Sequence, residues 1–361
     1  MPAQAIPVNI LLIGASGYIG GSVLAHLCSR PNNAGLHISA LVRNPADSEA
    51  IKSSYPQVET VLGDLGDKRL LYDAAAGSDV VIYAARNTQE GVEPLMSGLA
   101  GEGKNGIESS EEQCSRNRPA LFIMLSAIIS LADPKNLRLG EPPLESSKPM
   151  SDLEDKDAIM NLPEYHWHVA QERAFIRLAA EKGRGIITPV VMSLPFTVGN
   201  GTGPVRTRGF VHEYAKALLD RPGKKPFILG QGLNAWSWSS PRDLAAAVVF
   251  VMDWWKGNPN DNDLQGYIYA ESGQLEMRKL ARYVGQVSDS VSAGQEEEPS
   301  TSSDGCESLQ YPQFAELMPE LPGLWGVSAV CQADKLRSKG WKPMATSWEP
   351  LVDEVVRSSC V

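Results

Sequence analysis

Several features are missing from the sequence, and each absence excludes a class of protein. No run of about eighteen apolar residues occurs, so no membrane-spanning helix is expected. Residues 1–7 carry no basic stretch and lead into a strand-like run, so they do not resemble a signal peptide. Basic residues are outnumbered by acidic ones and the net charge is −10. This charge argues against nucleic acid or an anionic membrane as a partner.

Cysteine is scarce, and its spacing fits no cross-linked framework. The five residues form no CxxC pair: Cys28, Cys114, Cys306, Cys331 and Cys360. An odd, scattered set predicts reduced thiols, with neither a disulfide framework nor a zinc site, and no other metal site is expected. Together with the missing export and membrane signals, this predicts a cytoplasmic protein.

The first half of the chain alternates apolar, β-rich runs with amphipathic stretches. Nearly continuous apolar runs are typical of parallel strands that are covered on both faces. The expected strands are Val8–Ile13, Leu36–Val42, Val58–Leu62, Val80–Tyr83, Leu121–Ser126 and Ile186–Met192, and the expected helices include Tyr18–Arg30 and Glu164–Lys182. The pattern predicts an α/β fold, a doubly wound parallel sheet of the Rossmann type, over residues 1–193.

The second half is expected to form a smaller substrate-binding lobe, residues 194–361, with late Rossmann elements around residues 225–270. Gly209–Asp220 and Pro241–Trp255 have helical character. The lobe is rich in tryptophan, which indicates either an aromatic pocket or ordinary core packing. Two segments break the pattern: Ser97–Arg118 is predicted to be a mobile loop, and the acidic, serine-rich Ser288–Ser308 is predicted to be disordered.

A glycine-rich loop joins the first predicted strand to the first predicted helix. It reads Gly14-Ala-Ser16-Gly17-Tyr18-Ile19-Gly20. The first glycine allows a tight turn, the second lets the backbone approach a pyrophosphate, and the third lets helix and strand pack closely. Phosphates then lie at a helix N-terminus, where free N–H groups favour negative charge. Placed between a strand and a helix, the loop predicts dinucleotide binding.

The residue at the tip of the second strand distinguishes the two nicotinamide cofactors. An NAD site usually has an acidic residue there, which binds the ribose hydroxyls. Here the strand Leu36–Val42 ends in Arg43-Asn44-Pro45. An arginine at this place can pair with a 2′-phosphate, so NADP(H) is favoured over NAD(H).

The order and spacing of further motifs resemble the extended and atypical short-chain dehydrogenases/reductases, the branch of epimerase/dehydratase and NmrA-like proteins, in its fungal form. The motifs are the glycine loop, Leu41-Val-Arg43-Asn-Pro45, Gly63-Asp64-Leu65, Gly77 to Ala85, Leu125-Ser126, Leu194 to Gly199, Gly230 to Trp236 and Asp243-Leu244. The resemblance implies that Asp64 and Leu65 border the adenine. It also implies that Ala84 and Ala85 line the nicotinamide ribose and that Pro195 lies near the carboxamide.

The catalytic pattern of that superfamily is incomplete. Its members use a serine together with a tyrosine and a lysine four residues apart on one helix face. Ser126 matches the serine, but no tyrosine of this chain has a lysine four residues later. In the helix that should carry the pair, Tyr165 has Val169 at the lysine position. Counting back from Glu172 instead puts His168 there, with Glu164 in the place of the tyrosine.

Three functions remain open. In the first, the chain transfers hydride with Tyr165 or His168 as the proton donor. In the second, it keeps NADP(H) bound and performs an isomerisation, epimerisation, dehydration or cyclisation. In the third, it is a dinucleotide sensor without catalysis. Histidine titrates near neutrality, which suits it as a donor. We expect a small organic metabolite as the substrate, carbonyl reduction as the reaction and a homodimer as the assembly. A nucleotide sugar is less expected, because the sequence has no clear basic cluster for a second pyrophosphate. Arg206 and Arg208 keep this alternative open.

Overall fold

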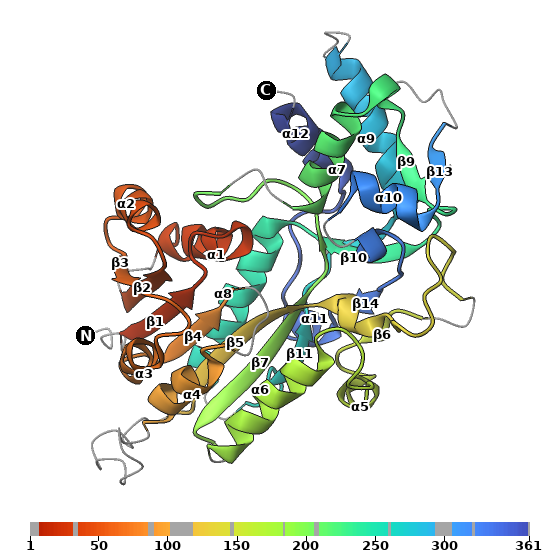
Figure 1. Cartoon of the computed structure of the whole chain (residues 1–361). Coiled ribbons are helices and arrows are strands. Elements are labelled where there is room, and N and C mark those ends of the chain that lie inside the picture. The colour runs from red at the N-terminus through yellow and green to blue at the C-terminus, as the bar shows by residue number, and fades with distance from the viewer. Residues whose placement is uncertain are drawn as a thin grey trace.

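The computed structural model describes residues 7–31, 35–85, 90–101, 118–144, 148–182, 185–205, 209–258, 261–292, 305–319 and 322–359. A seven-stranded parallel sheet organises the first lobe (Figure 1). Its strands are β1 (Val8–Ile13), β2 (Leu36–Val42), β3 (Glu59–Leu62), β4 (Val80–Tyr83), β5 (Ala120–Ala127), β7 (Ile187–Leu194) and β11 (Gly266–Tyr269). They lie in the order β11-β7-β5-β4-β1-β2-β3. The chain reverses direction across the sheet between β1 and β4, the place where Rossmann folds bind their ligands.

Helices cover both faces of this sheet (Figure 1). The helices on one face are α1 (Tyr18–Cys28), α2 (Pro45–Ser54) and α8 (Pro241–Gly257), and those on the other are α3 (Lys68–Ala76), α4 (Val92–Ala100) and α6 (Val169–Glu181). Because both faces are covered, the central strands are almost wholly buried: every residue of β4 and all but the last of β5 are buried. This double burial explains why the strands appear in the sequence as continuous apolar runs.

The second lobe is built on small sheets that pack at the carboxyl end of the large one. Its strands are β8 (Phe196–Thr197), β10 (Ala235–Ser239) and β12 (Gly273–Glu276) in one sheet, β9 (Phe227–Leu229) with β13 (Glu307–Leu309), and β6 (Met150–Ser151) with β14 (Cys331–Gln332). Its helices are α5 (Lys156–Met160), α7 (Phe210–Leu219), α9 (Met277–Ser292), α10 (Tyr311–Leu317), α11 (Asp334–Ser338) and α12 (Glu349–Ser359). Three short 3₁₀ helices are η2 (Ile128–Leu131), η3 (Pro222–Lys224) and η4 (Pro322–Trp325).

The α/β Rossmann fold predicted from the sequence is confirmed, and three local predictions are wrong in part. The helix expected over Glu164–Lys182 begins only at Val169, because residues 164–168 form turns. The expected loop Ser97–Arg118 starts inside α4, and residues 102–117 lie outside the described part. Of Ser288–Ser308, the first five residues continue α9 and residues 307–308 belong to β13, while residues 293–304 lie outside it.

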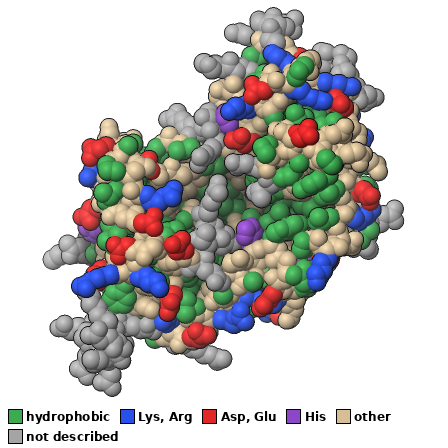
Figure 2. Space-filling model, in the orientation of Figure 1, with side chains coloured by type: hydrophobic (Ala, Val, Ile, Leu, Met, Phe, Trp, Pro, Cys, Tyr) green, Lys and Arg blue, Asp and Glu red, His purple; other side chains and the backbone are tan. Residues whose placement is uncertain are grey.

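The surface of the molecule is hollowed between the two lobes (Figure 2). On the face shown, hydrophobic side chains gather on the second-lobe side of this hollow. Within the described ranges, no helix has the length and apolar character needed to cross a membrane. The carboxyl ends of the strands point toward the hollow, so residues at those ends are the ones placed to meet a ligand there.

Candidate active site

The glycine loop has the geometry that a bound pyrophosphate requires. Gly14 has a φ of +83°, a left-handed conformation that favours glycine, and a Cβ there would lie 2.7 Å from the carbonyl oxygen of Ala84. A Cβ on Gly20 would collide with the Gly14 carbonyl. The amide of Gly17, the N-cap residue of α1, donates to the Gly14 carbonyl oxygen at 2.9 Å. The loop is therefore held tightly against β1 and β4 with no room for side chains at these glycines.

The first turn of α1 leaves its N–H groups available to an anion. No side chain caps the helix, and its first turn contains no acidic residue. The side chains of Tyr18 and Ile19 face the protein: the Tyr18 hydroxyl donates to the Gly199 carbonyl, and Ile19 packs against the core. Ser16 is half-buried beside the loop. This chain therefore fits the diphosphate of a dinucleotide at this helix end.

The residues expected to surround the rest of the cofactor follow the carboxyl ends of β2, β3, β4 and β7. Arg43 is exposed and forms no hydrogen bond or ion pair with any described residue, whereas Asn44 caps α2 by accepting from the Asp47 amide at 2.8 Å. Asp64 is exposed and accepts from the Gly66 amide at 2.9 Å, beside half-buried Leu65. Ala84 and Ala85 are half-buried after β4, and Pro195 is buried after β7.

Ser126 lies near the end of β5, where it donates a hydrogen bond to a carboxyl group that the sequence did not single out as functional. The acceptor is Oε1 of Glu172, one turn inside α6. Ser126 is 7% exposed and Glu172 is fully buried. Burial raises the pKa of the Glu172 carboxyl to about 7, against the smaller opposing effects of Ser126 and Tyr267. A buried carboxyl group whose pKa lies near neutrality can store a proton.

Glu172 appeared in the sequence only as a marker for the register of its helix. Its burial is the signal that sequence reasoning missed. A charged residue in the middle of a helix whose neighbours at one-turn spacing are apolar, Val169 and Phe175 among them, must lie on the buried face. Its partner Ser126 is 46 residues away in the sequence, so the contact itself depends on how α6 packs on the sheet.

The structure places Tyr165 and His168 before α6, in the turns that lead into it. Tyr165 is 45% exposed, and its ring lies between Lys135, whose Nζ is 3.7 Å from the ring centroid, and the ring of His166. His168 is the N-cap residue of α6 with a φ of +68°, and burial lowers the pKa of its imidazole. Its carbonyl oxygen accepts from the Glu172 amide at 2.9 Å, so it stands one turn from that carboxyl.

His166 does not share the position of His168. It is buried, and its Nδ1 is 2.8 Å from the Ser130 carbonyl oxygen, while its Nε2 is 3.9 Å from the Asp133 carboxylate. These contacts connect the turn before α6 to the segment that follows β5. His166 therefore holds the two segments together around the end of β5, and a hydrogen bond to a backbone carbonyl oxygen is suited to that purpose.

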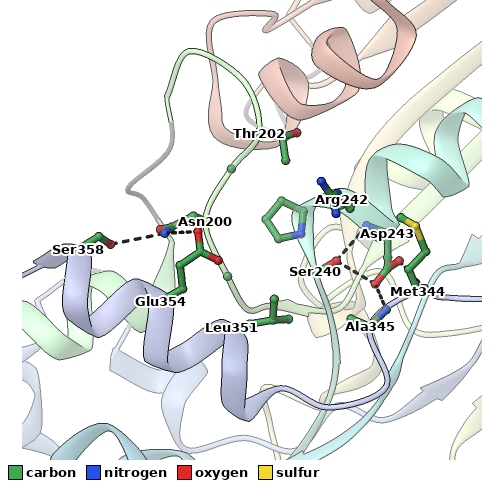
Figure 3. A pocket seen from close by; sticks show the side chains of 13 residues that line it. Asn200, Thr202, Ser240, Arg242, Asp243, Met344, Ala345, Leu351, Glu354 and Ser358 are labelled. Carbon is green, nitrogen blue, oxygen red and sulfur yellow. Dashed lines mark hydrogen bonds between the residues drawn. The ribbon is translucent and has the colours of Figure 1, made fainter. Parts of the chain in front are cut away.

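A second polar region lies where the first turn of α8 meets α12 (Figure 3). A cavity of about 650 Å³ opens there, between the loop Gly199–Thr202, the start of α8 and one face of α12. Asp243 lies in the first turn of α8. Its buried carboxylate accepts from Ser240 Oγ at 2.8 Å and from the amides of Met344 and Ala345 at 2.7 and 3.2 Å. Asp243 therefore connects α8 to the segment before α12.

The tryptophans pack in the core of the protein. Five of them are at most 6% exposed: Trp236, Trp238, Trp255, Trp325 and Trp341. Four cavities in the described part of the chain have no tryptophan in their walls. Of the two interpretations of the aromatic second lobe, core packing is the one that these positions support. Arg206 and Arg208 lie outside the described residues.

Comparison with known sequences finds a family match in the part of the chain that contains the glycine loop. The sequence model of the NmrA-like family matches residues 8–94, which contain the glycine loop, Arg43 and Asp64. Over nearly the whole length, the chain is 27% identical to the oxidase ucsJ of Acremonium sp., covering 96% of this chain and 95% of that protein. The two chains therefore match over nearly their whole length. Their sequence identity is too low to transfer the substrate or the reaction of the relative to this chain.

Solved structures share the fold at low sequence identity. dTDP-glucose 4,6-dehydratase from Bacillus anthracis, in complex with NAD, has a TM-score of 0.62 and 14% identity, covering 97% of this chain and 96% of that one. UDP-glucose 4-epimerase from Thermotoga maritima, with UDP-glucose, has a TM-score of 0.60 and 14% identity, covering 97% of each. The resemblance to epimerase/dehydratase and NmrA-like proteins predicted from the sequence is confirmed, and the chain has a nicotinamide-dinucleotide-binding fold.

Proposed function

We propose that this chain binds NADP(H) and catalyses hydride transfer to a small, largely apolar carbonyl compound. The observation that carries the proposal is the phosphate cradle at Gly14–Gly20 together with an exposed arginine at the tip of β2 that has no partner in the described part of the chain. An acidic residue at that tip would repel a 2′-phosphate, whereas the Arg43 guanidinium can form charge-assisted hydrogen bonds with it. The name of the fungal relative, an oxidase, agrees with redox chemistry.

The residues of this chain divide the binding of the cofactor among them. The N–H groups at the start of α1 hold the diphosphate, and Arg43 and Asn44 lie at the adenosine end. Asp64 and Leu65 border the adenine, while Ala84, Ala85 and Pro195 line the nicotinamide end, as the family resemblance implies. When bound in its reduced form, the cofactor supplies a hydride. Ser126, at the carboxyl end of β5, is placed to hydrogen-bond the carbonyl oxygen of the substrate.

The substrate is proposed to enter from the hollow between the lobes. A cavity of about 510 Å³ lies between residues 131–144 after β5 and Val327–Val330 of the second lobe. Most of its wall is apolar, with Leu131, Pro142 and Val330 among the lining residues. The cavity begins five residues after Ser126, so a molecule that fills it approaches the end of β5 from the second-lobe side. A small apolar metabolite fits such a wall better than a nucleotide sugar.

A binding titration with NADPH and NADH tests the cofactor, and loss of nicotinamide absorbance in the presence of carbonyl compounds tests the reaction. Tighter binding of NADPH and its consumption with a carbonyl substrate would support the proposal. Equal affinity for both cofactors would contradict the NADP(H) assignment. Tight binding with no turnover of any metabolite, and with different affinities for the oxidised and reduced forms, would identify a sensor.

A redox-neutral reaction is the second candidate, and one observation favours it. The tyrosine–lysine pair is absent, and two of the proteins with this fold are a dehydratase and an epimerase. In that case the metabolite would change while the amounts of NADP⁺ and NADPH stayed constant. Incubation with a metabolite extract, followed by mass spectrometry and nicotinamide absorbance together, separates the two candidates.

A further inference from the structure

A compact set of buried polar groups lies between α6 and the sheet. Ser126, Ser193 and Tyr269 occupy one row across β5, β7 and β11, because Ser193 is the register partner of both others. Side chains at paired positions of neighbouring strands point to the same face, and those two residues apart along a strand do so as well. Tyr267 therefore shares that face. The hydrogen bond between Ser126 and Glu172 identifies it as the face that α6 covers.

We call Ser126, Glu172, Ser193, Tyr267 and Tyr269 the α6 cluster. It contains more hydrogen-bonding atoms than partners. Among the described residues, Glu172 Oε2, Ser193 Oγ and the hydroxyls of Tyr267 and Tyr269 are buried without a hydrogen bond. The Tyr267 hydroxyl lies close enough to the Glu172 carboxyl to lower the pKa of that carboxyl somewhat. The geometry between the two groups falls short of a hydrogen bond. Such unpaired polar atoms are rare in a folded interior, and a chemical role is one explanation for them.

Among the described residues, no cation forms an ion pair with the Glu172 carboxyl. Arg173, the next residue, directs its guanidinium to the carbonyl oxygens of Met160 and Leu162. Asp152, another carboxyl near the cluster, accepts from the Tyr269 amide at 2.8 Å. An ionised Glu172 would therefore be a buried charge with one unpaired oxygen, which is costly. The neutral acid is the favoured form in these surroundings.

We infer that Glu172 stores the proton of the reaction and passes it through the Ser126 hydroxyl to the substrate oxygen, in place of the missing tyrosine–lysine pair. The inference rests on the proposed function, because the reduction of a carbonyl compound provides the oxygen that accepts the proton. Glu172 is fully buried, so it is a positioning residue that acts through Ser126. For the transfer the contact reverses its direction: the protonated Oε1 donates to Ser126 Oγ, and the serine proton turns to the substrate oxygen. A hydroxyl can accept one hydrogen bond while it donates another.

The step balances with the reduced dinucleotide as the hydride donor. A bound reduced dinucleotide would supply the hydride for the new C–H bond at the carbonyl carbon, and the carbonyl π electrons would take the Ser126 proton to form the O–H bond. Ser126 recovers a proton from Glu172 Oε1, which becomes a carboxylate. The carbonyl compound is reduced to an alcohol and the dinucleotide is oxidised. Water restores the proton to Glu172 after the product has left.

The first experiment observes the proton directly. Infrared difference spectra between wild type and Glu172→Gln, recorded from pH 5 to pH 9, would show the C=O stretching band of a protonated carboxylic acid. We expect the band to persist to near-neutral pH and to disappear above it. Glu181→Gln provides the matched control, because Glu181 is exposed at the end of the same helix. A Glu172 that is already ionised at pH 5 would overturn the inference.

The second experiment follows NADPH consumption with 4-nitrobenzaldehyde as the carbonyl probe. We expect the wild-type kcat to fall as the pH rises through neutrality. Glu172→Gln should lower kcat about 100-fold and remove this pH dependence, while Glu181→Gln changes neither. A Glu172→Gln enzyme that keeps the wild-type pH profile would overturn the relay and leave the reductase function standing. Absence of turnover by the wild type would contradict the reductase function instead, and the infrared titration would still decide whether Glu172 stores a proton.

Discussion

Two buried carboxyl groups, Asp243 at the start of α8 and Glu172 under α6, differ in how their oxygens are satisfied. Both are at most 1% exposed. Asp243 accepts hydrogen bonds on both carboxylate oxygens. The donors are two hydroxyls, at 2.8 and 3.5 Å, and two backbone amides, at 2.7 and 3.2 Å. Glu172 has a hydroxyl partner on one oxygen and none with good geometry on the other. The same chemical group is therefore placed in two opposite environments.

The two environments distinguish a carboxylate that has a structural role from a carboxyl group that holds a proton. Hydrogen bonds from amides favour the ionised form, because they replace the water that burial removes. A carboxylate that is satisfied on both oxygens connects segments of the chain, as Asp243 does between α8 and Met344–Ala345 (Figure 3). A carboxyl with an unpaired oxygen gains by keeping its proton, so it can give that proton up when a substrate arrives. The number of donors around the group decides between the two roles.

The largest expected effect is the loss of the Asp243 carboxylate. Asp243→Ala would leave the amides of Met344 and Ala345 buried without acceptors, which costs about 3–4 kcal/mol of unfolding free energy. Urea unfolding at pH 7 measures this loss. Asp253→Ala on the same helix is the control, since its pair with Arg30 is half-exposed and contributes less than about 1 kcal/mol. Similar losses for both variants would show that Asp243 does not connect the two segments.

Glu172→Gln should instead raise the unfolding free energy relative to the wild type, by an amount that depends on pH. The folded-state pKa is raised from 4.5 to about 7, so the folded protein binds more protons than the unfolded chain between these values. The wild type therefore loses stability as the pH rises from about 4.5 to about 7, by up to about 3 kcal/mol from this group. The glutamine variant lacks this loss and should gain on the wild type over that range. Urea unfolding at half-unit pH steps tests it, and a constant difference between the two proteins would contradict the raised pKa.

The exposed Arg43, which has no partner among the described residues, provides a third comparison with a smaller expected effect on stability. Arg43→Ala removes a guanidinium that has no described protein partner, so stability should hardly change. Loss of its charge-assisted bonds to a 2′-phosphate should weaken NADPH binding roughly 10- to 100-fold, while NADH binding changes less than about twofold. Calorimetric titration with both cofactors measures this. Lys52→Ala, an exposed cation on the neighbouring α2, should leave both affinities unchanged; equal losses for NADPH and NADH in Arg43→Ala would refute the assignment.

The sequence predicts the Rossmann half well and the proton site poorly, for identifiable reasons. The bounds of β1, β2 and β4 were predicted correctly, because strands covered on both faces leave uninterrupted apolar runs. The start of α6 was predicted five residues too early, since the periodicity of residues 164–168 resembles a helix although His168 has a positive φ. The bond between Ser126 and Glu172 depends on how α6 packs on the sheet, and no local pattern encodes that contact.

The smallest expected effect separates this proton site from Tyr165, one of the two donors that the sequence offered. Tyr165→Phe keeps the ring that lies against Lys135 and His166 and removes only a hydroxyl, so the unfolding free energy should change by less than about 0.5 kcal/mol. If the proton passes through Ser126, NADPH consumption with 4-nitrobenzaldehyde should stay within about twofold of the wild type. A loss of about 100-fold, the size expected for a general acid, would instead make Tyr165 the donor. Glu172 would then be left with the same role as Asp243, a carboxyl group that holds two parts of the chain together.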